Sequence, residues 1–313
     1  LLLLVGTVAV LDLFHRRNGN ECWRPLLTEP GVAQAQRGGS TEVWDCVGYT
    51  DGSFVFHPSL EAVQERIEAQ NDLAVSGKEP YVTVVYFGQM SFRKDDSRTA
   101  GVKGELMGLA VRQYHHNRYA PEGVPRIRLL IANAGYRWEH GAAVAEWIGQ
   151  RISEDDIVAA VGFGQSMETT RETIRKLSGY ALPMVSSTAT YDYIGTLEEA
   201  GEEGGGEGKE DFYSDFFFPT APSNSRVADQ TAELVAAGRV GGEVRNVLAL
   251  AYTAEAELYG PHLAKEFIRA LESRDGSVRG RVDGYSDVAE LGSVVDDICR
   301  DGDQPDLVYY AGR

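Results

Sequence analysis

Small hydroxyl side chains follow two short apolar runs near the middle of this chain, without an acid–base pair or a set of metal ligands beside them. The run 157–162 leads into Phe-Gly-Gln-Ser-Met-Glu, and the run 183–186 opens into Ser-Thr-Ala-Thr-Tyr. Short apolar runs are typical of strands buried on both faces of a parallel sheet. Because open α/β sheets bind ligands at the carboxyl ends of adjacent strands, the two loops predict a site that holds a small polar molecule without transforming it.

The same residues also allow a catalytic interpretation, but the sequence supports it less well. The segment Gly-Gln-Ser-Met-Glu at 164–168 is one residue short of the Gly-x-Ser-x-Gly nucleophile elbow, and its strand-to-helix context is right. A hydrolase also needs a histidine on a late loop with an acid behind it, and no histidine follows His262. No predicted strand is followed by the Gly-x-Gly-x-x-Gly of dinucleotide enzymes. We therefore expect no enzyme and no cofactor, and keep an α/β hydrolase as the less favoured alternative.

The cysteines and histidines do not form the pattern of a metal site. No cysteine pair has the close spacing of a zinc site, and the adjacent His115 and His116 point in different directions on a helix. In an exported protein Cys22 and Cys46 would form a disulfide that closes a loop of about 25 residues, and two free cysteines are the alternative. Cys299 is predicted to be a core residue on the apolar face of a helix. No metal is expected.

Charge and the first residues of the chain indicate where the protein works. The net charge of −17 over 313 residues argues against nucleic acid as a partner, because few cations would face the phosphates. Part of this charge lies in an acidic, glycine-rich insert at 198–211, which predicts a disordered surface loop. The apolar run 1–14 is too short to span a bilayer. It is interpreted as the remnant of a signal sequence or membrane anchor, with a buried element as the alternative, so we expect an extracytoplasmic protein, membrane-anchored or secreted.

Strands and helices alternate regularly after residue 80, which predicts an α/β fold of doubly wound parallel sheets with right-handed crossovers. The predicted strands cover 81–87, 127–132, 157–162, 216–220, 247–252, 278–285 and 307–310, and the predicted helices cover 104–114, 141–152, 169–177, 225–237, 258–271 and 288–300. An N-terminal extension at 15–79 carries a short strand at 54–56 and a helix at 59–71. The acidic insert divides two units, 80–215 and 216–313.

Several of these segments carry a resemblance to a known family. They are the helix Gly-Glu-Leu-Met-Gly-Leu-Ala-Val-Arg at 104–112, the block 161–168, Pro-Met-Val-Ser-Ser-Thr-Ala-Thr at 183–190, Tyr-Gly at 259–260 and Leu-Val-Tyr-Tyr-Ala-Gly at 307–312. Their order and spacing resemble the type I periplasmic binding proteins, in particular the substrate-binding proteins of branched-chain amino acid ABC transporters. The resemblance implies two lobes that trap an amino acid-like or carboxylate ligand for a transporter permease. It makes 80–215 most of the first lobe and 216–313 a partial, truncated second lobe.

The resemblance also assigns ligand-binding residues. It implies that Ser166 binds charged groups of the ligand, that Ala189 and Thr190 do the same from the next loop, and that Tyr259 closes over the ligand. Arg313 stands where the amino acid binders have a tyrosine, and an arginine pairs well with a carboxylate or a phosphate.

Two further hydroxyls are weaker candidates, and each assignment has a structural alternative. Ser187 lies in the same loop as Thr190, and Ser91 lies in the loop after the first predicted strand. Ser166 would otherwise cap a helix, the loop hydroxyls would bind only the loop, and Tyr259 would be a core residue. A membrane-fixed sensor built on the same two-lobe module is the alternative to transport.

Overall fold

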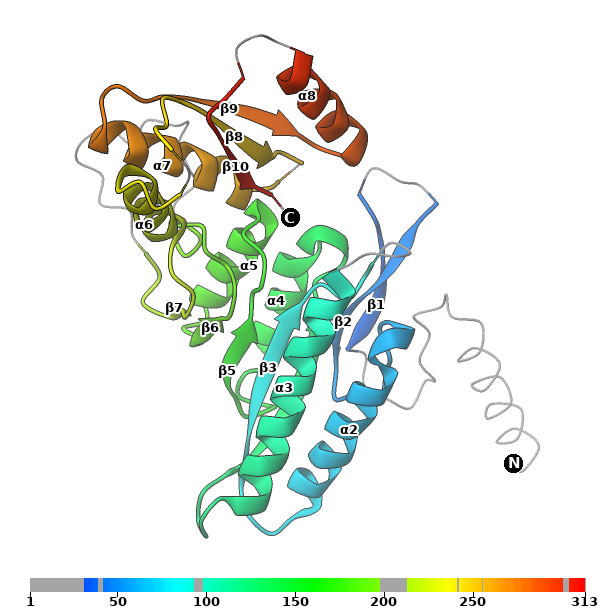
Figure 1. Cartoon of the computed structure of the whole chain (residues 1–313). Helices are drawn as coiled ribbons and strands as arrows, with labels where there is room; N and C mark the ends of the chain where they lie inside the picture. The colour runs from blue at the N-terminus through cyan, green and yellow to red at the C-terminus, as the bar shows by residue number, and fades with distance from the viewer. Residues whose placement is uncertain are drawn as a thin grey trace. The chain divides into compact units, whose positions relative to one another are not determined.

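Two separate sheets carry the chain, and both are drawn in Figure 1. The computed structural model describes residues 31–38, 42–92, 98–197, 213–240, 242–254, 256–300 and 304–312. The chain divides into two compact units. The first contains the described residues up to Gly162 together with 172–185, and the second contains 163–171 together with the described residues from 186 onward.

The larger sheet is mixed rather than wholly parallel. Its seven strands have the order β1-β2-β4-β3-β5-β6-β7. They are β1 Val32–Gln36, β2 Trp44–Thr50, β3 Tyr81–Gly88, β4 Arg126–Asn133, β5 Ile157–Gly162, β6 Met184–Ser186 and β7 Phe217–Pro219. The central strands β4, β3 and β5 are parallel as predicted, whereas β1 and β2 are antiparallel to their neighbours and were not predicted. Sequence pattern missed β2 because it contains Asp45 and Gly48; Asp45 is buried and paired with Arg37 at 2.6 Å.

Helices cover both faces of this sheet, as a doubly wound fold requires. They are α2 Glu61–Ser76, α3 Arg98–Tyr119, α4 Gly141–Gln150 and α5 Glu168–Ser178, with short 3₁₀ helices η1 Pro58–Leu60 and η2 Tyr136–Trp138. The alternation of a strand directs Tyr86 into the core beneath α2 and α3, and directs Phe87 to the other face, where it stacks on Trp138 at 5.8 Å between ring centroids. Figure 1 shows α2 and α3 side by side.

The predicted strand at 54–56 is absent from the structure. Phe54 donates its backbone N–H to the Thr50 hydroxyl at 3.0 Å, and Phe56 donates its N–H to the Gln64 amide oxygen at 3.3 Å. These side-chain acceptors take the place of a neighbouring strand, so the segment forms a bend. The helix predicted next to it is present as η1 and α2, and His57 caps its start by accepting from the N–H of Ser59.

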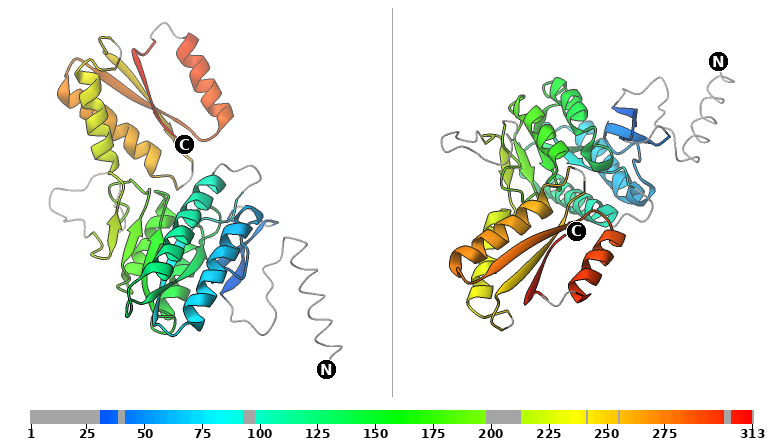
Figure 2. Two further views of the ribbon diagram at one scale, coloured as in Figure 1. Left: turned by 60° about the horizontal axis from the view of Figure 1, so that its bottom comes forward. Right: turned by 90° about the horizontal axis from the view of Figure 1, so that it is seen from above.

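The smaller sheet contains three parallel strands in the order β10-β8-β9. The second unit contributes β8 Asn246–Tyr252, β9 Arg279–Tyr285 and β10 Leu307–Ala311, with helices α6 Asn224–Ala236, α7 Tyr259–Arg274 and α8 Val288–Arg300. Helices α6 and α7 form the core with one face, and α8 packs on the other through Leu291, Val294 and Ile298. Figure 2 shows α8 across the sheet from α6 and α7, so this sheet is also doubly wound.

Several predictions fall outside the described residues or change with the structure. The apolar run 1–14, the acidic insert 198–211, Cys22 and Arg313 lie outside the described residues. Cys46 is disulfide-bonded, so its predicted pairing with Cys22 stays a prediction. Cys299 is free and exposed on α8, and its prediction as a core residue was wrong.

Among the described helices, none is long and apolar enough to cross a membrane. The boundary at 215/216 stays a prediction.

Candidate functional site

A sharp turn at the end of β5 begins the first candidate loop. Gly162 has φ 115°, and a Cβ atom there would lie 2.3 Å from the carbonyl oxygen of Phe87, so only glycine fits. The next residue, Phe163, also has a left-handed φ of 53°. Its ring is buried and meets the ring of Phe217 edge to face at 6.1 Å. The aromatic contact holds a strained turn and fixes the direction of the loop that carries Ser166.

Ser166 joins three segments of the second unit. Its hydroxyl oxygen accepts hydrogen bonds from the backbone N–H groups of Thr190, at 3.0 Å, and Tyr191, at 3.1 Å. Its carbonyl oxygen accepts from the N–H of Leu258 at 3.0 Å. The side chain is 2% exposed. Ser166 therefore fastens the loop after β6 and the start of α7, and its hydroxyl does not cap α5.

The loop after β6 places the other predicted hydroxyls differently from one another. The Ser186 hydroxyl donates to the carbonyl of Phe163 at 3.1 Å and accepts from the N–H of Ala189 at 3.2 Å. Ala189 is buried at 1% exposure, whereas Ser187 is exposed. The hydroxyl oxygen of Thr190 is buried and has no hydrogen-bond partner within the part of the chain that the structure describes. Of the predicted residues in this loop, Thr190 is therefore the strongest candidate for a hydrogen bond to a ligand.

Asn224 was not predicted, and it links Thr190 to Tyr259. As the first residue of α6 it donates its backbone N–H to the carbonyl of Thr190 at 2.7 Å. Its amide nitrogen donates to the carbonyl of Tyr259 at 3.1 Å and lies 3.3 Å from Nδ1 of His262. The only signal in the sequence is the Ser-Asn pair at the helix start, because Ser223 accepts from the N–H of Arg226 as the N-cap.

Among the described residues, seven buried side-chain polar atoms have no hydrogen-bond partner, and four of them belong to these segments. They are Gln165 Oε1, Thr170 Oγ1, Thr190 Oγ1 and Asn224 Oδ1, all in the second unit. Leaving a buried polar atom without a hydrogen bond costs about 1–3 kcal/mol. Folded proteins leave few such atoms, so these four are candidates for contact with a ligand.

Tyr259 begins α7 and is half-buried against the core of the second sheet. Its N–H donates to the Glu257 carboxylate at 3.1 Å, and its carbonyl is held by Asn224. Tyr259 therefore packs against the core, which was the alternative to ligand binding. Its contact with a ligand stays a prediction.

His262 and Asp192 lie beside the hydrogen bonds that Asn224 forms with Thr190 and Tyr259. Nδ1 of His262 is 3.7 Å from Asp192, whose carboxylate also accepts from the N–H of Ser225 at 3.0 Å. The imidazole meets the ring of Tyr191 at 4.8 Å and the ring of Tyr193 at 5.8 Å. Burial lowers the pKa of His262, and the negative charge of Asp192 opposes that shift.

One buried cation lies on α5. Arg171 is 3% exposed, and its Nε and Nη2 atoms both donate to a single oxygen of Glu168, at 3.0 and 2.8 Å. Glu168 is the first residue of the helix, where a negative charge is favourable. A guanidinium has five N–H donors, so this pair leaves part of the donor capacity of Arg171 for another acceptor.

Ser91 lies in the first unit, apart from the other described candidates along the chain. It is buried, and its hydroxyl accepts from the amide of Asn133 at 3.0 Å. The amide oxygen of Asn133 accepts from the N–H of Met90 at 2.7 Å. These bonds fasten the ends of β3 and β4 to each other. Within the described residues no group of three histidine, cysteine, aspartate or glutamate side chains could hold a metal ion.

Comparison with solved structures identifies the fold. The chain is similar to an ABC transporter substrate-binding protein from Desulfitobacterium hafniense in complex with Leu, with 19% identity, 75% of this chain and 58% of that chain covered, and a TM-score of 0.50. It is similar to the branched-chain amino acid transporter substrate-binding protein LivJ from Streptococcus pneumoniae in complex with isoleucine, with 16% identity, 74% and 56% covered, and a TM-score of 0.53. A solute-binding protein of an ABC transporter from R. palustris in complex with 4-hydroxybenzoate has 15% identity, 74% and 53% covered, and a TM-score of 0.50.

These similarities confirm the predicted type I periplasmic binding protein fold. The chain spans little more than half the length of the three proteins. No protein-family model matches the sequence, and no curated protein matches it.

Proposed function

We propose that this chain is part of an extracytoplasmic solute-binding protein that captures a small amino acid-like or carboxylate metabolite for an ABC transporter. The observation that carries the proposal is the group of buried, unpartnered oxygens on Gln165, Thr170, Thr190 and Asn224. A ligand that hydrogen-bonds to these atoms removes the cost of burying them alone.

The chemistry of these groups favours a ligand that both donates and accepts hydrogen bonds. The amide nitrogen of Asn224 is placed by the carbonyl of Tyr259, so the other atom of the amide is an oxygen that only accepts. It calls for an ammonium or hydroxyl on the ligand. The Thr190 hydroxyl can donate, and the remaining donors of Arg171 suit a carboxylate. A zwitterion supplies both kinds of group.

The solved structures support this ligand class. Two of the similar proteins hold Leu or isoleucine, and a third holds 4-hydroxybenzoate. All three are small carboxylic acids that combine the charged group with an apolar part. The binding of such a molecule requires no acid–base pair at the loops.

The loops also lack the arrangement of a hydrolase. Ser166 Oγ accepts from the backbone N–H groups of Thr190 and Tyr191, and no histidine of the described residues bonds to it. A nucleophilic serine needs a base within hydrogen-bond reach. Binding without turnover is therefore the function we propose.

Titration calorimetry tests the proposal with a panel of amino acids, aliphatic carboxylates and hydroxybenzoates. We expect one class to bind, and Thr190→Val to weaken that binding at least tenfold, which is about 1.4 kcal/mol. Thr188→Val is the matched control, because Thr188 is exposed and, among the described residues, its hydroxyl bonds only to the carbonyl of Gly164. Turnover of any panel member, or equal affinity in Thr190→Val, would overturn the proposal.

A further inference from the structure

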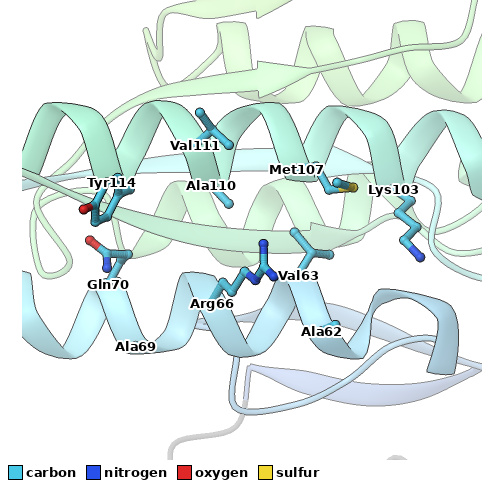
Figure 3. A pocket seen from close by; sticks show the side chains of 10 residues that line it. All are labelled: Ala62, Val63, Arg66, Ala69, Gln70, Lys103, Met107, Ala110, Val111 and Tyr114. Atoms are coloured by element: carbon cyan, nitrogen blue, oxygen red, sulfur yellow. The ribbon is translucent and has the colours of Figure 1, made fainter.

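An apolar groove runs between α2 and α3, wholly within the first unit and separate from the loops described above. Its cavity volume is about 460 Å³, within the roughly 300–1,000 Å³ of small-molecule sites. The two helices run in the same direction along it, and Figure 3 shows Arg66 of α2 and Lys103 of α3 each reaching toward the opposite helix.

The wall that α3 contributes is apolar and exposed. Met107, Val111 and Tyr114 recur at helical spacing, and they are 48%, 67% and 50% exposed. The floor is made by the buried side chains of Val63 and Ala110. Single exposed apolar residues are normal on a protein surface, whereas a contiguous apolar patch indicates a binding surface.

Neither cation at this groove has a counter-ion among the described residues. The positions three and four residues from Arg66 hold Ala62, Val63, Ala69 and Gln70, and those from Lys103 hold Thr99, Ala100, Leu106 and Met107, so neither cation has an acid at helical spacing. Neither side chain forms a hydrogen bond or ion pair with a described residue. In a chain of net charge −17, two unpaired cations over an apolar floor select an anionic partner.

We propose that this groove binds a single-chain amphiphilic anion, an unbranched alkyl carboxylate, whose chain lies along Met107 and Val111 and whose negative charge is attracted by Arg66 and Lys103. From Lys103 to Tyr114 the helix advances about 16 Å. An extended chain of about a dozen bonds has that length. Each methylene removed from water adds to the affinity of such a chain.

Two other occupants fit the charges less well. A second copy of the chain packed symmetrically on this groove would bring the same two cations together from both sides, which is repulsive. An anionic membrane surface would repel a chain of net charge −17, and a concave groove does not insert into a bilayer.

Calorimetry with monomeric dodecanoate tests the proposal on the purified protein. We expect saturable one-to-one binding, at least tenfold weaker in the double variant Arg66→Glu, Lys103→Glu. Arg112→Glu is the matched control, since Arg112 is an exposed cation on α3 outside the groove. Because all three side chains are exposed, these variants keep the core intact. Thr190→Val should leave dodecanoate binding unchanged, which separates this proposal from the proposed function.

Five results would overturn the proposal. Four of them are the absence of saturable binding, equal affinity for dodecyltrimethylammonium, an equal loss of affinity in Arg112→Glu, and displacement of dodecanoate by the panel ligand that needs Thr190. Sedimentation velocity supplies the remaining one: a concentration-dependent dimer of the free protein that Val111→Glu dissociates would make a second copy the occupant.

Discussion

The hydroxyl oxygen of Ser166 accepts a hydrogen bond from the backbone N–H of Thr190 at 3.0 Å, so the two hydroxyl residues of the predicted site have different roles. Ser166 also accepts from the N–H of Tyr191, which occupies both of its acceptor positions. The hydroxyl of Thr190 has no hydrogen-bond partner among the residues that the structure describes. One residue fastens the loop, and the other presents a group from it.

Ser166→Ala should lower the free energy of unfolding by about 1–3 kcal/mol, because two backbone N–H groups lose their acceptor in a buried place. Thr190→Val should leave stability unchanged or raise it, since it removes a buried hydroxyl that bonds to none of the described residues. Urea unfolding followed by circular dichroism compares the two. Equal losses in both variants would contradict the division of roles.

Gly162→Ala should lower the free energy of unfolding by more than about 2 kcal/mol, because the residue has φ 115° and its Cβ would meet the carbonyl of Phe87. Gly104→Ala is the matched control. A Cβ on Gly104 would meet nothing within 4 Å, and alanine in a helix interior should stabilise by about 0.5–1 kcal/mol. Thermal unfolding measures both, and a stable Gly162→Ala protein would refute the geometry of the turn.

Stability should fall in mild acid because of His262. Burial lowers its pKa from 6.5 in the folded chain, with Asp192 and Glu266 opposing and Arg269 and Lys265 assisting the shift. The unfolded chain therefore binds the proton first as pH falls through 6.5. The contribution of neutral His262 is present above that pH and is lost between 6.5 and the lowered folded value.

Urea unfolding at a series of pH values checks the sign, with the difference between acid and neutral stability as the readout. His262→Gln should reduce that difference. Burial lowers the pKa of His57 as well, so His57→Gln should remove a separate part of it. Stability that rises on acidification through this range would show that His262 is not held neutral.

Cys46 is disulfide-bonded and Cys299 is free and exposed, so alkylation without reduction should label Cys299 alone. A peptide map should then recover Cys46 joined to Cys22. Cys46→Ser should cost about 3 kcal/mol of stability in the chain-entropy model. Labelling of Cys46 in the unreduced protein would contradict the bond.

The sequence by itself determined the α/β class and nearly all of the repeating elements. Local patterns predict these elements: examples are the apolar run 157–162 and the helical spacing of Leu263, Phe267 and Leu271. Such patterns can be recognised in the sequence without knowledge of tertiary contacts. The hydroxyl loops were also found, because a glycine and small polar residues directly follow each apolar run. The comparison with solved structures then confirmed the fold that their order predicted.

Only the tertiary structure decided what each side chain does at those loops. Ser166 and Thr190 read alike in sequence, yet burial and a pair of N–H groups give the first a structural role. Asn224 joins Thr190 to Tyr259 across 34 and 35 residues. Strand β2 likewise pairs with β4, more than 80 residues further along the chain, and its buried Asp45 is paired with Arg37. Sequence periodicity cannot predict such contacts, because they form only when segments distant in sequence are brought together.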